Sequence, residues 1–258
     1  MGLGPIWRLR GTEVAPDEVA AEALSTPPAQ ESRPRSTARI AAGAPQPTVM
    51  QAGLTDPPDN GSARAARIAQ LEWDALQPDI EQCRACGLCE VRQRVVPGMG
   101  DRAAQVMFVG EGPGAEEDRQ GLPFVGAAGK LLDAMLAAIG LSRDAGVYIA
   151  NTVKCRPPRN RTPEAAEMAA CRPYLERQIE LVRPRLLVAL GRPAAQVLLG
   201  DAEVRINAAR GKLFRHGETP VLVSYHPAYL LRNPADKAKV WEDLCALRRH
   251  LEAGSNQP

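Results

Sequence analysis

Short apolar runs alternate with longer segments of helical periodicity from about Ala63 onward. The short runs are typical of buried strands, and they lie at 105–110, 147–151, 185–191 and 221–227. Apolar residues at helical spacing predict helices at 63–77, 127–139, 162 to about 181, 192–200 and 234–251. Strands that alternate with helices predict an α/β fold, a single three-layer domain with a central, mainly parallel sheet flanked by helices.

Residues 1–62 lack this periodicity. They contain 9 of the 23 prolines and one aromatic residue, Trp7. Such a segment cannot bury enough apolar surface to offset the entropy lost on ordering. We therefore expect a disordered, Pro/Ala-rich tail at 1–62, followed by one domain at 63–253.

Composition narrows the function classes. The net charge is only +2, so a nucleic-acid surface must be a local basic patch. No stretch approaches the ~20 apolar residues that a membrane span needs. The first residues also lack the apolar core of a secretory signal. We expect a cytoplasmic monomer that does not contact membranes.

Four of the six cysteines have the spacing of a metal site, Cys83-x2-Cys86 and Cys155-x15-Cys171. In a reducing compartment this clustering favours metal binding over disulfides. Zinc and iron–sulfur clusters both accept four thiolates, so the spacing leaves the choice open. The plainer alternative is that Cys155 and Cys171 are small core residues. Cys89 could replace one ligand, but the charged residues after it favour a non-ligand role.

Candidate binding residues lie where the predicted strands end, at Gly110–Gly114, Asn151 and His226. In open sheets of this type, ligands bind outside the carboxyl ends of the strands. The glycine-rich segment could cradle a phosphate, but it lacks GxxxxGK[ST] and its acidic residues would repel one. We expect its backbone to approach a flat ligand closely instead.

Five segments, in order, resemble the type-4 uracil-DNA glycosylase family. They are CRAC (83–86), GEGPGAEED with GLPFVGAAG (110–129), NTVKCRPPRNR (151–161), Cys171 and HPAYLLRNP (226–234). The resemblance covers about residues 65–252 and implies a uracil-DNA glycosylase-like fold. It also implies a [4Fe-4S] cluster held by Cys83, Cys86, Cys155 and Cys171.

The activity that the resemblance implies is base excision repair of DNA. The enzyme would flip uracil out of single- or double-stranded DNA and hydrolyse its N-glycosidic bond, which leaves an abasic site. No lysine is implied as a nucleophile, so a monofunctional enzyme is expected. The alternative is a non-catalytic or covalently binding uracil-DNA recognition protein of the same superfamily. A protein with a purely structural zinc ion is a further alternative.

The implied pocket gives each residue a physical role. Phe124 would stack on the flipped base, and the amide of Asn151 matches N3–H and O4 of uracil, which cytosine reverses. A ring N–H of His226 would stabilise negative charge on O2 of the leaving uracil. Each residue type also has a structural alternative: a core phenylalanine, an asparagine that caps a turn, and a structural histidine. The uracil-binding residues are expected to be Gly110, Glu111, Gly112, Phe124, Asn151 and His226.

Water activation is the open step, because type-1 uracil glycosylases carry an aspartate where this chain has Gly112. Glu111 is the candidate, so the expected catalytic residues are His226, Glu111 and Asn151. Glu117 is expected to exclude the methyl group of thymine. For DNA, an apolar wedge and an arginine are expected on a projecting loop, with a basic strip near the cysteines. These DNA-contacting residues are Leu230, Leu231, Arg232, Arg156, Arg159 and Arg161.

Overall fold

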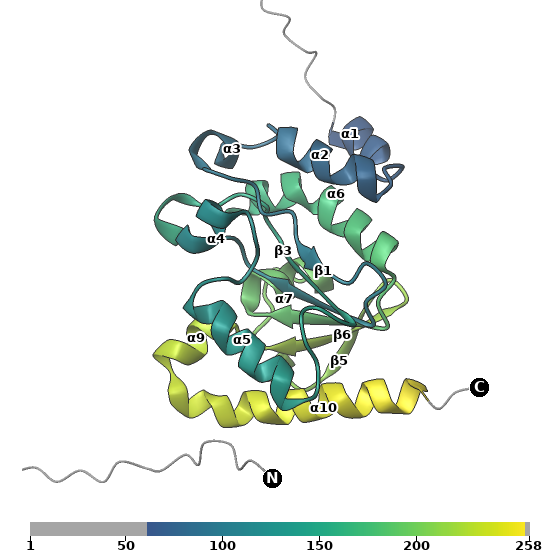
Figure 1. Cartoon of the computed structure of the whole chain (residues 1–258), viewed down its shortest axis with the longest axis vertical. Coiled ribbons are helices and arrows are strands. Elements are labelled where there is room, and N and C mark those ends of the chain that lie inside the picture. Colours follow the sequence, from purple (N-terminus) through teal and green to yellow (C-terminus); the bar gives the residue numbers. More distant parts are fainter. Residues whose placement is uncertain (1–60, 256–258) are drawn as a thin grey trace, which may run out of the picture. The chain divides into compact units, whose positions relative to one another are not determined.

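A six-stranded sheet forms the centre of the computed structural model, which describes residues 61–255 (Figure 1). The four inner strands are parallel, and the two edge strands run antiparallel to their neighbours. Across the sheet the strands are β1 (Met99–Gly100), β3 (Val147–Asn151), β2 (Val106–Gly110), β4 (Leu186–Leu190), β6 (Thr219–Ser224) and β5 (Leu213–His216). The predicted α/β class and mainly parallel sheet are confirmed.

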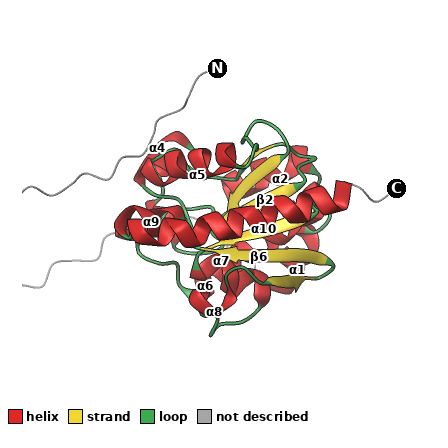
Figure 2. Ribbon diagram, turned by 90° about the horizontal axis from the view of Figure 1, so that it is seen from below, coloured by secondary structure: helices red, strands yellow, loops and turns green. Residues whose placement is uncertain are grey.

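Helices cover both faces of this sheet (Figures 1 and 2). Alternate residues of each strand point to opposite faces, so Phe108 packs with α5 and α10 while Met107 packs with α6 and α7. The main helices are α1 (Gly61–Ile68), α2 (Trp73–Gln82), α5 (Ala127–Ala138), α6 (Ala165–Val182), α7 (Arg192–Leu199) and α10 (Lys237–Ser255). The short ones are α3 (Leu88–Val91), α4 (Ala115–Gln120), η1 (Pro158–Asn160), α8 (Ile206–Ala209), α9 (Pro227–Arg232) and η2 (Pro234–Asp236).

A third apolar cluster lies outside the sheet, where α1 and α2 pack on α6. Ile68, Leu76 and Ile80 are fully or almost fully buried there, together with Tyr174 of α6. The Tyr174 hydroxyl donates a hydrogen bond to the carboxylate of Asp79 in α2 (2.6 Å). This cluster fixes the segment that carries the first cysteine pair against the helix that carries Cys171.

Several predicted elements needed correction. The helical pattern at 63–77 is two helices, because Glu72 is extended and starts α2 at Trp73. This break lets the Trp73 ring lie 5.5 Å from that of Tyr148. The helix predicted to start at residue 162 begins at Ala165, where the backbone N–H of Glu164 donates to Glu167 Oε2 (2.7 Å). The segment predicted as a projecting loop after His226 is helix α9.

The predicted tail, residues 1–62, lies outside the described residues except for its last two, which begin α1. The last predicted helix runs on to Ser255 and starts at Lys237, after the short η2 turn. Between residues 61 and 255, no helix is long and apolar enough to cross a membrane.

Candidate active site

A cleft of about 1160 Å³ opens at the carboxyl ends of the parallel strands. β2 leads into α5 on one face of the sheet and β4 leads into α7 on the other, so the cleft lies at the switch point of the topology. The residues predicted from sequence that line it are Glu111, Gly112, Glu117, Phe124, Asn151, Arg161, His226 and Arg232.

Asn151 ends β3 and is only 2% exposed. Its Oδ1 atom is buried and has no hydrogen-bond partner among the described residues. An unpaired buried acceptor costs roughly 1–3 kcal/mol. The register pairs Asn151 with Gly110 of β2, which places the amide above the glycine at the mouth of the sheet. The site therefore holds an acceptor that is ready for a ligand N–H.

Gly110 leaves room for two side chains that converge on it. A Cβ atom there would lie 2.5 Å from Asn151 Oδ1 and 2.6 Å from Phe124 Cζ. Both distances are shorter than van der Waals contact, so only glycine permits this approach. Phe124 itself is buried and has φ of 53°, a left-handed conformation that is strained for a bulky residue.

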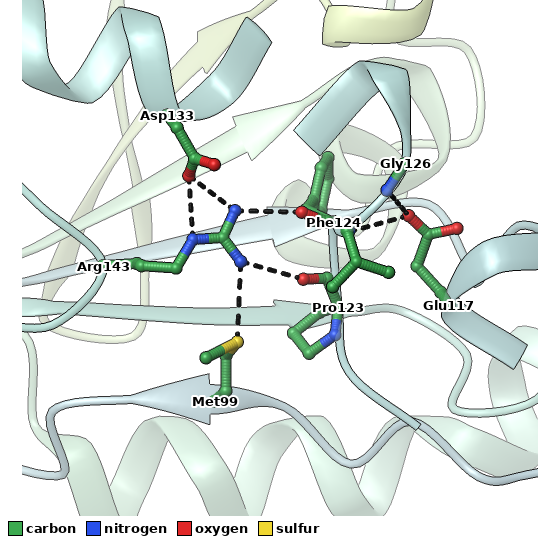
Figure 3. A network of polar contacts seen from close by, with 8 residues as sticks. Met99, Glu117, Pro123, Phe124, Gly126, Asp133 and Arg143 are labelled. Atoms are coloured by element: carbon green, nitrogen blue, oxygen red, sulfur yellow. Dashed lines mark hydrogen bonds and ion pairs between the residues drawn. The ribbon is translucent and has the colours of Figure 1, made fainter. Parts of the chain in front are cut away.

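The strained Phe124 loop is held from two sides (Figure 3). Arg143 donates hydrogen bonds to the carbonyl oxygens of Pro123 (3.2 Å) and Phe124 (2.9 Å), and it is fixed in turn by Asp133 (2.6 Å). On the other side, Glu117 Oε1 accepts from the backbone N–H groups of residues 125 and 126, both at 2.9 Å. These bonds stabilise the position of the phenyl ring at the cleft.

His226 lies beside this ring, with ring centroids 5.4 Å apart and planes 29° from parallel. Its Nδ1 atom accepts a hydrogen bond from the backbone N–H of Ala228 (3.1 Å). Nδ1 therefore carries no proton, and a neutral imidazole must carry its proton on Nε2. Burial lowers the pKa of His226 to about 4, with Arg232 adding to the effect and Glu117 opposing it. The cleft thus contains a neutral N–H donor.

Glu111 is the acidic side chain that follows β2 into the cleft. Burial raises its pKa, while a hydrogen bond with Thr162 and the charge of Arg232 oppose the rise. Gly112 cannot be replaced by a larger residue without a shift, since a Cβ there would lie 2.8 Å from Val153 Cγ2. An aspartate at this position would therefore require Val153 to move.

The cysteines line a second, small cavity under α2 and α6. All four predicted ligands face it, and Cys89 faces it as well. Within residues 61–255, no group of three or more His, Cys, Asp or Glu side chains is arranged to hold a single metal ion. Cys155 and Cys171 are buried and belong to the third apolar cluster.

Positive groups surround this cavity. Arg92 donates to Cys155 Sγ (2.9 Å), and Arg64 donates to Cys83 Sγ (3.4 Å). The backbone N–H of Lys154 points at Cys171 Sγ (3.3 Å). N–H donors and cations compensate the negative charge that four thiolates carry when they bind metal. The donor set therefore fits a thiolate-bound cluster.

Comparisons with known proteins identify the family to which this chain belongs. The Uracil DNA glycosylase superfamily matches residues 97–245. A type-4 uracil-DNA glycosylase of Sulfurisphaera tokodaii is 43% identical over 68% of this chain and 83% of that protein. The type-4 enzyme of Archaeoglobus fulgidus is 48% identical over 62% and 84%, and that of Thermotoga maritima is 45% identical over 64% and 87%. The chain belongs to the type-4 uracil-DNA glycosylase family.

The superfamily match contains the cleft and half of the cysteine set of this type-4 chain. It includes Phe124, Asn151 and His226, as well as Cys155 and Cys171. It begins at residue 97, after Cys83 and Cys86. The first cysteine pair thus lies outside the segment that the wider superfamily shares.

The residues predicted to contact DNA differ in exposure in this structure. Leu230 is 1% exposed and packs in the core, so it is not free to enter a base stack. Leu231, its neighbour, is 44% exposed, and the exposed Arg232 lines the cleft. The wedge prediction stays with Leu231 alone.

The three arginines of the predicted basic strip also differ in their contacts. Arg161 lines the cleft, but its guanidinium donates two hydrogen bonds to Glu167, at 2.8 and 2.6 Å. Arg156 donates to Asn160 (2.7 Å) and lies 3.9 Å from Asp118. Arg159 is exposed. Arg159 does not line the cleft, and within the described residues no hydrogen bond or ion pair of its guanidinium is seen.

Sequence reasoning missed two residues of this type-4 site. Arg143 lies in the loop before β3, and nothing in its local pattern indicates that it holds the Phe124 loop. Lys154 lies between Asn151 and Cys155 in a matched segment, but it was read only as part of that segment. Its position between Asn151 and Cys155, two predicted functional residues, was the sequence signal that could have indicated a role for Lys154.

Proposed function

We propose that this protein is a monofunctional uracil-DNA glycosylase, which hydrolyses the N-glycosidic bond of flipped deoxyuridine to release uracil and leave an abasic site. The observation that carries the proposal is the buried, unpaired Oδ1 of Asn151 above Gly110. It is a hydrogen-bond acceptor that lacks only its ligand, and it lies beside an aromatic ring and a neutral imidazole.

Asn151 would read the base through its amide. Oδ1 accepts from uracil N3–H, and Nδ2 donates to O4. Cytosine has an acceptor at N3 and a donor at C4, so both contacts become mismatched. Each unsatisfied buried group costs roughly 1–3 kcal/mol. Phe124 stacks on the base in the pocket, and the absence of a side chain at Gly110 lets the base reach the amide.

Glu117 would exclude thymine by closing the pocket around the base. Its carboxylate lines the cleft and accepts from three backbone N–H groups, those of residues 114, 125 and 126. A side chain fixed in this way cannot swing aside for a methyl group. This fixed position supports the proposed role of Glu117 in excluding thymine.

His226 would stabilise the leaving group. As the glycosidic bond breaks, negative charge develops on uracil O2, and a donor placed for that charge lowers the barrier. The Nε2–H of the neutral imidazole is such a donor. Because Ala228 holds Nδ1, the proton cannot move to the other nitrogen without losing that bond. His226 thus acts as a fixed donor, and it needs no proton from solvent.

Glu111 would orient the attacking water. Its carboxylate lines the cleft, and Thr162 and Arg232 keep a charged form available despite burial. No aspartate stands at Gly112, and the Val153 side chain occupies the space that one would need. Water then captures an oxocarbenium-like sugar after uracil has begun to leave.

The rate of uracil release is expected to rise with pH through the pKa of Glu111. That pKa is raised by burial, so the active carboxylate is lost as pH falls through a value above that of an ordinary glutamate. His226, with a pKa of about 4, is neutral throughout this range and adds no second step above about pH 5. Single-turnover rates against pH for wild type and Glu111→Gln measure this. An unchanged acidic limb in the variant would exclude Glu111.

The cysteine cavity would hold a [4Fe-4S] cluster through Cys83, Cys86, Cys155 and Cys171. Four thiols around one apolar cavity, with Arg64 and Arg92 contacting two of them, support this assignment. When bound, the cluster supplies a structural cross-link. The ligands tie the segment before β1 to the turn after β3 and to α6, and none of the four cysteines lines the cleft.

DNA would be held at the rim of the cleft. Leu231 is exposed next to the cleft residue Arg232, so it can fill the space left by a flipped base while Arg232 meets a phosphate. Arg159, in the η1 turn, adds a second phosphate contact.

Incubation with an oligonucleotide that contains one uracil tests the proposal. We expect free uracil and an alkali-labile abasic site, with the strand uncut before alkali. Matched oligonucleotides with thymine or cytosine should give neither product. Tight or covalent retention of uracil DNA without base release would instead identify a recognition protein.

A further inference from the structure

Lys154 is a buried lysine that the proposed chemistry does not use. It is 1% exposed. Its Nζ atom donates to the carbonyl oxygen of Asn151 (2.9 Å) and to Gln178 Oε1 (2.6 Å). Its backbone N–H points at Cys171 Sγ (3.3 Å), and its carbonyl oxygen accepts from Val96 (2.8 Å). One residue thus contacts the end of β3, α6 and a predicted cluster ligand.

The chemistry of this position is costly for a lysine. Moving an ammonium group out of water carries a large desolvation penalty unless it is paired. Both side-chain acceptors of Lys154 are neutral, and no carboxylate contacts its Nζ within the described residues. A methionine would fill the same space without a charge. Lys154 lines the cysteine cavity, where its ammonium group can compensate thiolate charge, and its two hydrogen bonds give the ammonium group a second role, which is to hold the Asn151 carbonyl and Gln178.

What it holds is the backbone of the residue that reads the base. Asn151 cannot fix its own amide, because its Oδ1 has no partner within residues 61–255. The position of that amide therefore depends on its packing over Gly110 and on its backbone, which is paired to Gly110 and bonded to Lys154. Gln178 aims the ammonium group and is itself held, since its Nε2 donates to Pro97 O (2.8 Å).

We propose that Lys154 is a positioning residue, which fixes the Asn151 amide for uracil and links it to the cysteine cavity. The proposal rests on the proposed function of Asn151. Lys154 does not touch the base. It acts through the Asn151 carbonyl, while its own backbone N–H donates to Cys171 Sγ. The base-reading amide and the cluster ligands thereby share one rigid turn.

A double-mutant cycle tests this role. Lys154→Met is expected to lower the single-turnover rate of uracil release by about 10- to 100-fold, the scale of a misplaced catalytic group. On the Asn151→Ala background the same change should cost less than about 3-fold, because the group that it positions is gone. On the His226→Ala background the full loss should remain. Equal losses on all three backgrounds would overturn the proposal.

Binding provides a readout that does not depend on turnover. The same cycle is measured as affinity for an oligonucleotide with an uncleavable 2′-fluorinated deoxyuridine, and iron content and visible absorption are recorded for each protein. A wild type that binds this DNA but releases no uracil would refute the proposed function and leave the cycle interpretable. Wild-type turnover with an additive cycle would refute only the positioning role.

Two further variants separate positioning from loss of structure. Leu175 lies in the apolar cluster between α6 and the sheet, so Leu175→Ala destabilises α6 without removing either hydrogen bond of the Lys154 ammonium group, and its effect should be the same with and without the Asn151 side chain. Gln178→Leu removes one support of the ammonium group from a position two turns of α6 away from Cys171. If the Lys154→Met protein fails to load iron, Gln178→Leu replaces it in the test of the positioning role. Its rate loss should disappear on the Asn151→Ala background, and persistence there would overturn the proposal.

Discussion

Replacing His226 by alanine is expected to lower the single-turnover rate of uracil release by about 10²- to 10³-fold, the usual loss when one donor to a developing anion is removed. The reason is geometric. Ala228 fixes Nδ1 as an acceptor, which leaves Nε2–H as the donor that faces the cleft, and burial keeps the imidazole neutral. Affinity for uracil DNA should change much less, because the charge on O2 develops only as the bond breaks.

His216 provides a matched control for this change. Both of its ring nitrogens are engaged outside the cleft, with Glu176 Oε2 (2.7 Å) and Leu198 O (2.9 Å). His216→Ala is expected to lower the melting temperature and to leave uracil release unchanged. Rapid-quench measurement of uracil release by the two variants and by wild type tests the role of His226. Similar rates for wild type and His226→Ala would remove His226 from the mechanism.

Cys155→Ser is expected to damage folding more than chemistry. Loss of the cluster would release the segment before β1 from the turn after β3, and we expect a cost on the scale of a lost disulfide cross-link, about 2–5 kcal/mol. For a domain of this size that corresponds to a fall of roughly 10 °C in the melting temperature. Thermal unfolding by circular dichroism, with iron and sulfide analysis, measures the effect.

Cys89→Ser is the matched control, because Cys89 lines the same cavity and is not an expected ligand. It should retain iron, sulfide and the visible absorption of the wild type. A Cys155→Ser protein with full iron and an unchanged melting temperature, but without turnover, would contradict the structural role. Loss of iron in Cys89→Ser would revise the ligand set.

The inner strands could be predicted because they are buried on both faces and their residues form unbroken apolar runs. The edge strands could not. β1 has two residues, and β5 alternates exposed and half-buried positions with Leu213 turned outward. Helix α9 was also missed, although a proline directly after His226 is a common start for a helix.

The cleft was predictable in outline because Asn151 and His226 follow strands that end at one edge. Their detailed roles depend on contacts across the fold. The unpaired Oδ1 follows from the register of β2 against β3, and the state of His226 follows from a backbone N–H two residues on. The place of Lys154 between Asn151 and Cys155 was visible in the sequence, but its burial against Gln178, 24 residues later in α6, was not.

The measurement that tests the central claim most directly is uracil release by wild type and by Asn151→Ala. Each protein is incubated in excess with a single-uracil oligonucleotide, and free uracil is quantified over time. The account predicts rapid release by wild type and a loss of about 10²-fold or more in the variant, because two base contacts worth roughly 1–3 kcal/mol each are removed. Equal release by both proteins, or no release by wild type, would contradict it.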